Sequence, residues 1–399
     1  MYKCFLAKAK KKWAKHLNLC RSPCVSFPKV EPIKNRKSTS SYSCAFSFLN
    51  LTLNGNNNEK NIKTILIFTL FICKAFGQNN ELQNFVDQGV KLYDNGDYKG
   101  AIEQYKKALQ VDKKSPLANY EISSTYFALK DYEKAIEHSD YVISAKSNYI
   151  DQAYILKGTA FDMLGKSKEA IKTYEKAIKE FPNNHLLYYN LGYTSYSLKE
   201  YKDAELALQN SLKIKPSHAS SHLLLGYVMS EQGNRVKSLL ALYNFLLLEP
   251  NGNRTKAAYE LLDFELKKGV KKENEKSTTI TLSDNKESDE FRAAELMLSL
   301  LEASKNLEEN EKKTEYELFA DNTKSFFSVL GELKKDNKGF WWNYYVDFFY
   351  SMTNDKHIEA FSYYITQSKE DEKIFIWLKD NKDKVEALSK WYSNYNRKF

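Results

Sequence analysis

Cysteine is missing from most of the chain. Its five cysteines all lie within the first 73 positions: Cys4, Cys20, Cys24, Cys44 and Cys73. A chain trimmed before Gln78 has no thiol, which suits an oxidising compartment. Cys20 and Cys24 have a spacing that metal sites use, but no second pair or histidine cluster completes it, so we predict no zinc site.

Acidic residues are scarce at the start of the chain. Of the 60 Lys and Arg residues, 14 precede Gln78, against only two of the 51 acids, Glu31 and Glu59. This leaves 46 basic and 49 acidic residues from Gln78 onward, so the net charge of +9 becomes −3 for that part. Its charges are scattered along the predicted helices and form no basic stripe, so we predict no nucleic-acid partner.

The chain also lacks a long apolar run. The run at residues 65–73 is about half of the ~20 residues that a helix needs to cross a bilayer. Two lysines precede it, and the small residues Ala75 and Gly77 follow it, which is the three-part pattern of a signal peptide over residues 59–77. We expect a mature chain that starts near Gln78, in a bacterial periplasm or outside the cell, with no membrane span. The alternative is attachment to a membrane through an uncleaved N-terminal helix.

Residues 1–58 are rich in lysine and serine, and Glu31 is their only acid. We interpret them either as a disordered extension or as a misassigned gene start. Their composition also fits a transit peptide, which would leave the signal peptide behind it unexplained. The sequence does not say whether they are translated.

Small residues recur with one period in the middle of the chain. The first row, with separations of 34, 35, 34 and 34 residues, is Gly89, Ser123, Gly158, Gly192 and Gly226. A second row with the same period is Ala101, Ala135, Ala170, Ala204 and Ser238. A third row is Ala108, Val142, Ala177, Ser211 and Phe245, and prolines close the last three units at Pro182, Pro216 and Pro250.

These rows resemble the tetratricopeptide repeat (TPR) family. In the third unit, six residues stand at the family's characteristic positions: Tyr154, Gly158, Ala170, Tyr174, Ala177 and Pro182. The resemblance extends from Leu82 to Gly252 and implies an all-α fold, a right-handed α-solenoid of five helical hairpins with a concave surface. The small residues then lie where two helices cross closely. Residues 256–268 are expected to cap a domain of residues 78–268.

In this family the first helix of each hairpin lines the concave face. Carried over to this chain, the resemblance implies a groove lined by Tyr93, Tyr120, Phe127, Tyr189, Tyr193, Tyr196 and Tyr227. Tyrosine suits protein binding, because its ring offers apolar area and a hydroxyl group at a small entropy cost. The alternative is that these rings pack sideways against neighbouring first helices. Relatives that bind chaperones carry Lys, Asn and Arg there to hold a C-terminal carboxylate, and the aromatic residues here disfavour that ligand.

Residues 269–288 are polar and are predicted to be a linker. Beyond it, residues 289–399 predict a small helical domain, with helices near 313–334, 338–353, 355–367, 369–379 and 382–396. The run from Phe340 to Tyr345 is almost wholly aromatic. We predict a core of stacked aromatic rings, because the run is nearly continuous around a helix. The alternative is a docking patch or a glycan-stacking surface.

Motifs for catalysis, cofactors and metals are not evident. Gly165-Lys166-Ser167 lacks the upstream glycine of a phosphate-binding loop, and His218 and His222 lack a third ligand. We therefore predict no catalytic residue, no cofactor and no metal.

The predicted function is a non-enzymatic scaffold for protein interactions, which binds a segment of a partner protein in the tyrosine-lined groove. One alternative is a C-terminal domain with enzymatic activity, for example on glycans, localised by the repeats. Another is a structural component of the cell envelope that associates with itself. The partner, the pathway, the oligomeric state and the role of the C-terminal domain do not follow from the sequence.

Overall fold

The computed structural model describes residues 80–274, 277–282, 290–305 and 307–397. The predicted signal peptide and residues 1–58 lie outside these residues. The chain forms two compact units that divide between Thr173 and Tyr174. None of the helices in the described residues is both long and apolar enough to cross a bilayer.

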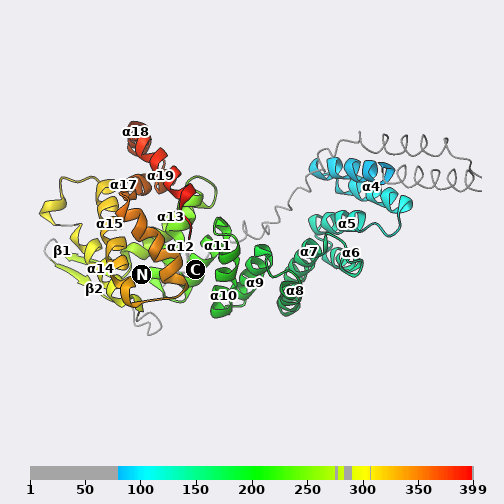
Figure 1. Ribbon diagram of the computed structural model, residues 1–399, viewed down its shortest axis with the longest axis horizontal. Helices are drawn as coiled ribbons and strands as arrows, with labels where there is room; N and C mark the ends of the chain where they lie inside the picture. The colour runs from blue at the N-terminus through cyan, green and yellow to red at the C-terminus, as the bar shows by residue number, and fades with distance from the viewer. Residues whose placement is uncertain (1–79, 275–276, 283–289, 306, 398–399) are drawn as a thin grey trace, which may run out of the picture. The chain divides into compact units, whose positions relative to one another are not determined.

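Unit 1 is a succession of helices joined by short turns. They are a helix over residues 80–94, α4 (Tyr98–Val111), α5 (Pro116–Ala128), α6 (Tyr132–Ser144), α7 (Ile150–Met163) and the first residues of α8 (Ser167–Glu180) (Figure 1). Side chains cap the N-termini of α4, α5 and α6, where Asp97, Ser115 and Asp131 accept hydrogen bonds from backbone N–H groups of the first turn. These caps explain why each helix begins where it does.

A residue with left-handed backbone ends the first helix of each hairpin. The φ angles lie between +64° and +82° at Gly96, Lys130, Gly165, Lys199 and Gly233. This conformation lets the chain leave a helix in a tight turn and is easiest for glycine. The 34-residue period therefore appears in the turns as well as in the helices.

The small residues lie at close helix crossings, as expected from their spacing. A Cβ atom at Gly192 would lie 2.9 Å from Cγ of Leu208, too close for a real contact. Ser123 takes the place of glycine in its hairpin, and its hydroxyl group donates a 2.6 Å hydrogen bond to the carbonyl oxygen of Ala135. Ser238 likewise donates to a carbonyl oxygen across its hairpin at 2.9 Å. The serines are tolerated because their buried hydroxyl groups are paired.

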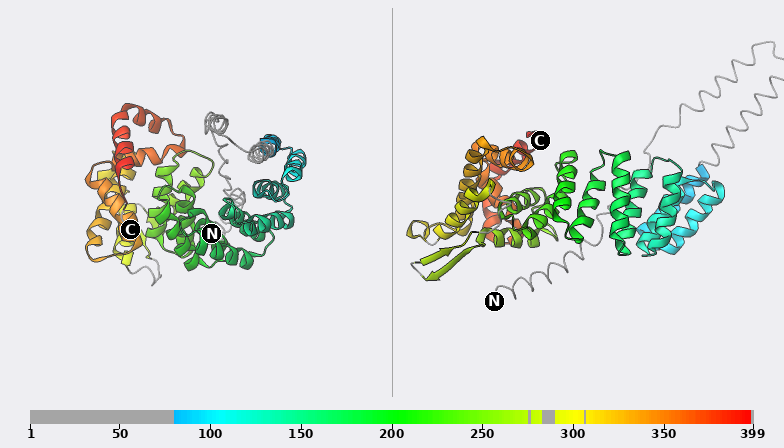
Figure 2. Two further views of the ribbon diagram at one scale, coloured as in Figure 1. Left: turned by 45° about the vertical axis from the view of Figure 1, so that its right-hand side comes forward. Right: turned by 90° about the horizontal axis from the view of Figure 1, so that it is seen from below.

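Unit 2 begins with the rest of α8 and the hairpins α9 (His185–Ser197) with α10 (Tyr201–Ile214) and α11 (Ala219–Glu231) with α12 (Arg235–Leu248), which lie side by side (Figure 2). Helix α13 (Thr255–Lys267) follows at the position predicted for a capping helix, but it contacts α14 and so does not end the packed array. The remaining helices include α14 (Arg292–Ser304), α15 (Glu315–Leu333), α16 (Asp347–Asn354), α17 (Ile358–Ile365), α18 (Glu372–Asp380) and α19 (Lys382–Asn394). They agree with the helices predicted for this region.

The segment predicted as a linker contains two β-strands that its polar sequence did not predict. Strands β1 (Val270–Asn274) and β2 (Ser277–Ile280) pair antiparallel, with Val270 opposite Ile280, and both strands contact α14. The helices before and after this segment also belong to one compact unit, because α12 and α13 contact α14, and α12 contacts α17. The boundary that we drew at residues 269–288 therefore does not separate two compact bodies.

Aromatic side chains form the core between the last hairpin and the C-terminal helices. Tyr243 of α12 is 1% exposed, and its ring lies 5.2 Å from Phe327, 6.1 Å from Phe349 and 5.8 Å from Phe361 between centroids. The aromatic run itself includes a π-helix, η4 (Trp341–Val346). Its rings are buried, as are those of the following turn: Trp341, Trp342, Tyr344, Tyr345, Phe348 and Phe349. The prediction of a stacked aromatic core is confirmed.

Candidate functional site

Two of the seven predicted groove residues lie in the interior of their units. Tyr120 of α5 is 3% exposed and stacks on Tyr149 at 5.7 Å, and Tyr189 of α9 is 8% exposed and meets His218 edge-on at 5.0 Å. Such rings hold adjacent first helices together. They offer little surface to a partner.

The other predicted residues of unit 1 are half-buried at the ends of first helices. Tyr93 lies in the last turn of the helix over residues 80–94, and its ring contacts Tyr98 edge-on at 5.2 Å across the turn. Phe127, near the end of α5, contacts Tyr132 in the same geometry at 5.3 Å. In each of these two hairpins, the edge-on contact across the turn orients the ring at the end of the first helix.

A carboxylate lies among the tyrosines of unit 1. Glu121 is the only charged residue of α5. Burial, and to a smaller extent the carboxylate of Asp94, raises the pKa of Glu121 to about 7. Sequence reasoning missed this residue, although a lone charge in an otherwise aromatic and hydroxylic helix was a visible signal. A group with such a pKa is a candidate for contact with a ligand.

In unit 2, three predicted residues form a half-buried tyrosine cluster, Tyr193, Tyr196 and Tyr227. Burial raises the pKa of Tyr196, and nearby Glu231 and Tyr201 add to the effect, as do the other two members. Tyr196 also meets Tyr201 at 6.0 Å between ring centroids. The tyrosine cluster combines apolar rings with hydroxyl groups.

The two histidines considered as metal ligands, His218 and His222, make hydrogen bonds within the protein. His222 is completely buried, and its Nδ1 atom lies 2.6 Å from the hydroxyl group of Tyr345 while its Nε2 atom lies 2.9 Å from the carbonyl oxygen of Pro216. A carbonyl can only accept, so Nε2 carries the proton and Nδ1 accepts from Tyr345. Nδ1 of His218 lies 2.7 Å from the hydroxyl group of Ser221.

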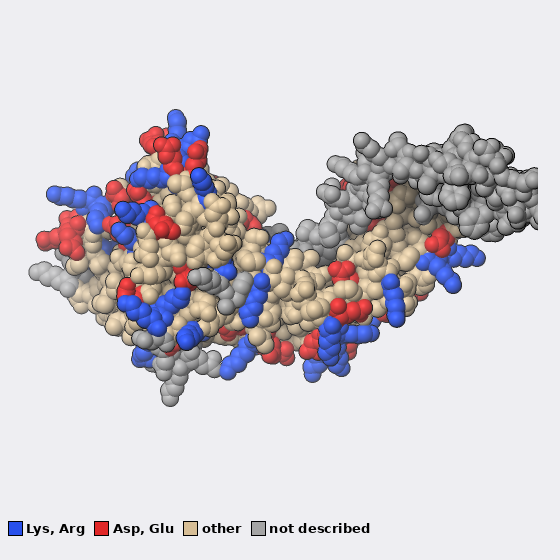
Figure 3. Space-filling view, in the orientation of Figure 1, with Lys and Arg blue, Asp and Glu red and all other residues tan. Residues whose placement is uncertain are grey.

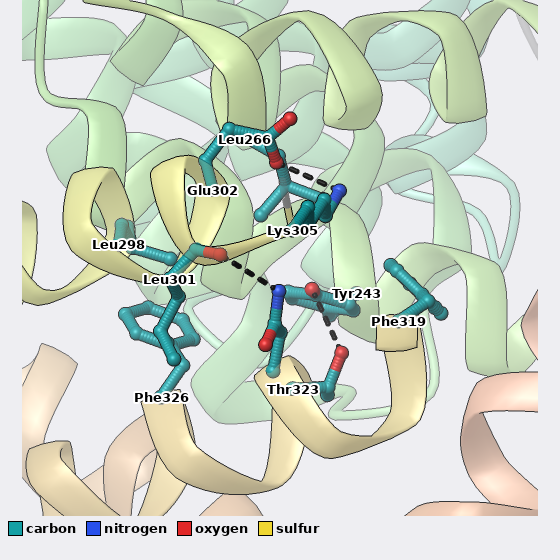
Figure 4. A pocket seen from close by; sticks show the side chains of 10 residues that line it. Tyr243, Leu266, Leu298, Leu301, Glu302, Lys305, Phe319, Thr323 and Phe326 are labelled. Atoms are coloured by element: carbon teal, nitrogen blue, oxygen red, sulfur yellow. Dashed lines mark hydrogen bonds and ion pairs between the residues drawn. The ribbon is translucent and has the colours of Figure 1, made fainter. Parts of the chain in front are cut away.

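The cavity shown in Figure 4 lies in the core of unit 2. It measures about 20 Å³ and is lined by Tyr243, Phe319 and Phe326 among others. The Tyr243 hydroxyl group lies 3.3 Å from that of Thr323, and Asn322 donates to the carbonyl oxygen of Leu301. This volume holds about one water molecule and no substrate.

A wider surface depression of about 380 Å³ lies between α15 and α17, lined by carboxylates. Each carboxylate is partnered: Lys313 binds Asp321 at 2.8 Å, Lys384 binds Glu359 at 2.7 Å, and Thr314 caps α15 together with Glu317. Hydrogen bonds from Thr314 lower the pKa of Glu317. A carboxyl group that remains ionised is poorly suited to act as a general acid.

The face of the molecule drawn in Figure 3 shows Lys and Arg interspersed with Asp and Glu over the C-terminal helices. Ion pairs of the C-terminal region include Lys369 with Glu315 and Lys334 with Asp347. Mixed charges of this kind provide no extended field of one sign on that face.

Comparisons with known proteins concern the repeats. A family profile described as TPR repeat matches residues 89–130, and two described as tetratricopeptide repeat match residues 117–149 and 155–219. The TPR repeat-containing protein MJ1428 of Methanocaldococcus jannaschii is 26% identical over 185 residues, which are 44% of this chain and 32% of the relative. The BBSome complex member BBS4 of Bos taurus is 29% identical over 176 residues, which are 44% of this chain and 33% of the relative.

This chain thus spans about a third of the length of these two relatives. Among solved structures, YrrB, described as a TPR protein with an unusual peptide-binding site, is 20% identical with a TM-score of 0.36, covering 47% of this chain and 95% of YrrB. The fold of this chain is all-α, with helical hairpins in succession. Its segment of residues 89–219 consists of tetratricopeptide repeats.

Proposed function

We propose that this chain is an exported, non-enzymatic scaffold that holds a segment of a partner protein against the first helices of its repeats. The observation that carries the proposal is a set of half-buried aromatic side chains on those helices: Tyr93, Phe127, Tyr193, Tyr196 and Tyr227. Aromatic side chains dominate the energetics of many protein interfaces, because they bury a large area for few rotatable bonds.

The buried members of the predicted groove have a supporting role in this proposal. Tyr120 and Tyr189 hold adjacent first helices at a set distance, which keeps the half-buried rings in place. Within each unit, aromatic rings that are held rigidly lose little entropy on binding. We therefore assign binding to the half-buried residues and positioning to the buried ones.

The proposal is tested by capture from a bacterial envelope extract with the full chain and with the double variant Tyr193→Ala, Tyr227→Ala. Tyr141→Ala is the matched control, because Tyr141 is a half-buried tyrosine on the second helix α6. We expect a partner that binds the full chain and the control but not the double variant, with equal helicity by circular dichroism. Equal capture by all three chains would show that the tyrosine cluster is not the binding surface.

Enzymatic activity of the C-terminal part is a second candidate, favoured by the carboxylates in the depression between α15 and α17. The pairing of each carboxylate weakens it. The tryptophans of the aromatic run are 5% and 1% exposed at Trp341 and Trp342, which leaves little ring surface for stacking on a glycan. The scaffold is therefore the function that the geometry supports best.

A further inference from the structure

Helix α14 exposes an apolar stripe. Its inner face packs on α13, α15 and both strands, with Ala294 and Leu298 buried. On its outer face Leu296 is 42% exposed and Leu300 is 48% exposed. Ala293, exposed, and Ala303, half-buried, lie at the two ends of the same face. We call Ala293, Leu296, Leu300 and Ala303 the α14 stripe.

The α14 stripe is continuous, which distinguishes it from isolated exposed leucines. Its members are three, four and three residues apart, the spacing of one helix face. Leu307, 51% exposed, lies just beyond its C-terminal end. Leu206 of α10 is 58% exposed, but its neighbours on that helix face are polar, as Asp203 and Gln209 show. Single exposed leucines are ordinary on protein surfaces, whereas continuous apolar patches mark interaction sites.

The order of residue types in the α14 stripe, Ala-Leu-Leu-Ala, is the same in both directions along the helix. A two-fold axis that crosses the outer face at the level of residue 298 would place Leu296 of one copy on Leu300 of the other, and Ala293 on Ala303. A two-fold interface requires a surface that is complementary to itself, which this order of residues provides. The leucines would interdigitate near the axis, where crossing helices are closest, and the small alanines at the ends would cause no clash.

Charges at the ends of α14 favour the antiparallel arrangement. Exposed Arg292 lies at the N-terminal end, and exposed Glu308 and Glu309 lie just beyond the C-terminal end. Antiparallel helices bring the positive end of each dipole, with its arginine, near the negative end of the other, with its glutamates. A parallel pair would place the two Arg292 side chains together at one end and the glutamates of both copies together at the other.

We propose that two copies of this chain associate through the α14 stripe in antiparallel orientation. The interface is small compared with the ~800 Å² per partner of a standard complex, so the dimer dissociates on dilution. The proposal is independent of the tyrosine-lined groove, since none of the residues involved belongs to the first helices of the repeats.

The test is sedimentation velocity of the full chain from roughly 1 to roughly 500 µM. We expect association that Leu296→Glu and Leu300→Glu each weaken at least tenfold, because the interface would bury two unpaired charges. Leu206→Glu is the matched control and leaves association unchanged. Both stripe positions are strongly exposed, so these variants remain folded, which circular dichroism verifies.

A second measurement determines which residues of the two α14 helices lie opposite each other. Benzoylphenylalanine introduced at position 296 is photolysed in a mixture of ¹⁴N- and ¹⁵N-labelled chains. Crosslinks between differently labelled chains should map to the segment around Leu300. A monomer over the whole concentration range would overturn the proposal, as would an effect of Leu206→Glu equal to that of the stripe variants, or crosslinks that map elsewhere.

Discussion

Lys130 and Lys199 occupy turn positions where the other hairpins have glycine. Both have φ of +64°, in the left-handed region that costs a residue with a Cβ atom about 1–2 kcal/mol. Asn95-Gly96-Asp97 was recognisable as a turn from its residue types. The turns at the two lysines were not, because lysine carries no preference for this conformation.

Replacement of Lys130 by glycine should therefore stabilise the protein by about 0.5–1 kcal/mol, after allowance for the greater freedom of glycine in the unfolded chain. Urea unfolding measures the change in free energy. Lys106→Gly is the control, because exposed Lys106 lies inside helix α4, where glycine lowers stability by a similar amount. A loss of stability in both variants would contradict the strain that we assign to Lys130.

Among the elements, α12 has an unusually apolar sequence, which the search for the repeat pattern did not take into account. The second helix of an ordinary hairpin has one solvated face, but α12 is apolar nearly all round, and its side chains from Leu239 to Leu247 are all buried. A helix that is hydrophobic on every side has to be covered on every side. The sequence thus indicated that something packs on the fifth hairpin. It did not indicate which helices, because several later segments have apolar faces of similar width.

The contact between α11 and η4 predicts how stability depends on pH. Burial, with a contribution from Arg397, lowers the pKa of His222 well below 6.5, so the folded protein keeps the ring neutral. The unfolded chain binds a proton as the pH falls below about 6.5, which costs up to about 1.4 kcal/mol of stability per pH unit. Stability is therefore greatest above this pH and declines in acid.

His222→Gln should flatten that decline, because glutamine does not titrate. Urea unfolding of both proteins between about pH 7.5 and about pH 5 measures the slope. A smaller slope should remain in the variant, since burial also lowers the pKa of His185 to about 4 and of His218 to about 3. Identical slopes in the two proteins would show that His222 is protonated in the folded state, contrary to the burial that we expect to keep its ring neutral.

For the whole molecule, the proposed export makes a prediction about charge. Removal of the segment before Gln78 takes away 14 basic and two acidic residues, so the isoelectric point should fall from about 8.9 to below 7. Isoelectric focusing and N-terminal sequencing of the protein from envelope and culture-medium fractions measure this change. A basic, untrimmed protein found only in the cytoplasm would contradict export.

The 34-residue period was enough to locate every hairpin of the repeats, because each hairpin depends mainly on local features: small residues at a crossing, a cap and a tight turn. The resemblance to the tetratricopeptide family, and not the period itself, named the candidate aromatic residues on the first helices. Burial of Tyr120 and Tyr189, the pairing of β1 with β2 and the placement of the aromatic run against α12 needed the three-dimensional structure. These features depend on contacts between residues far apart in the chain, and residue type alone does not specify which apolar surfaces meet.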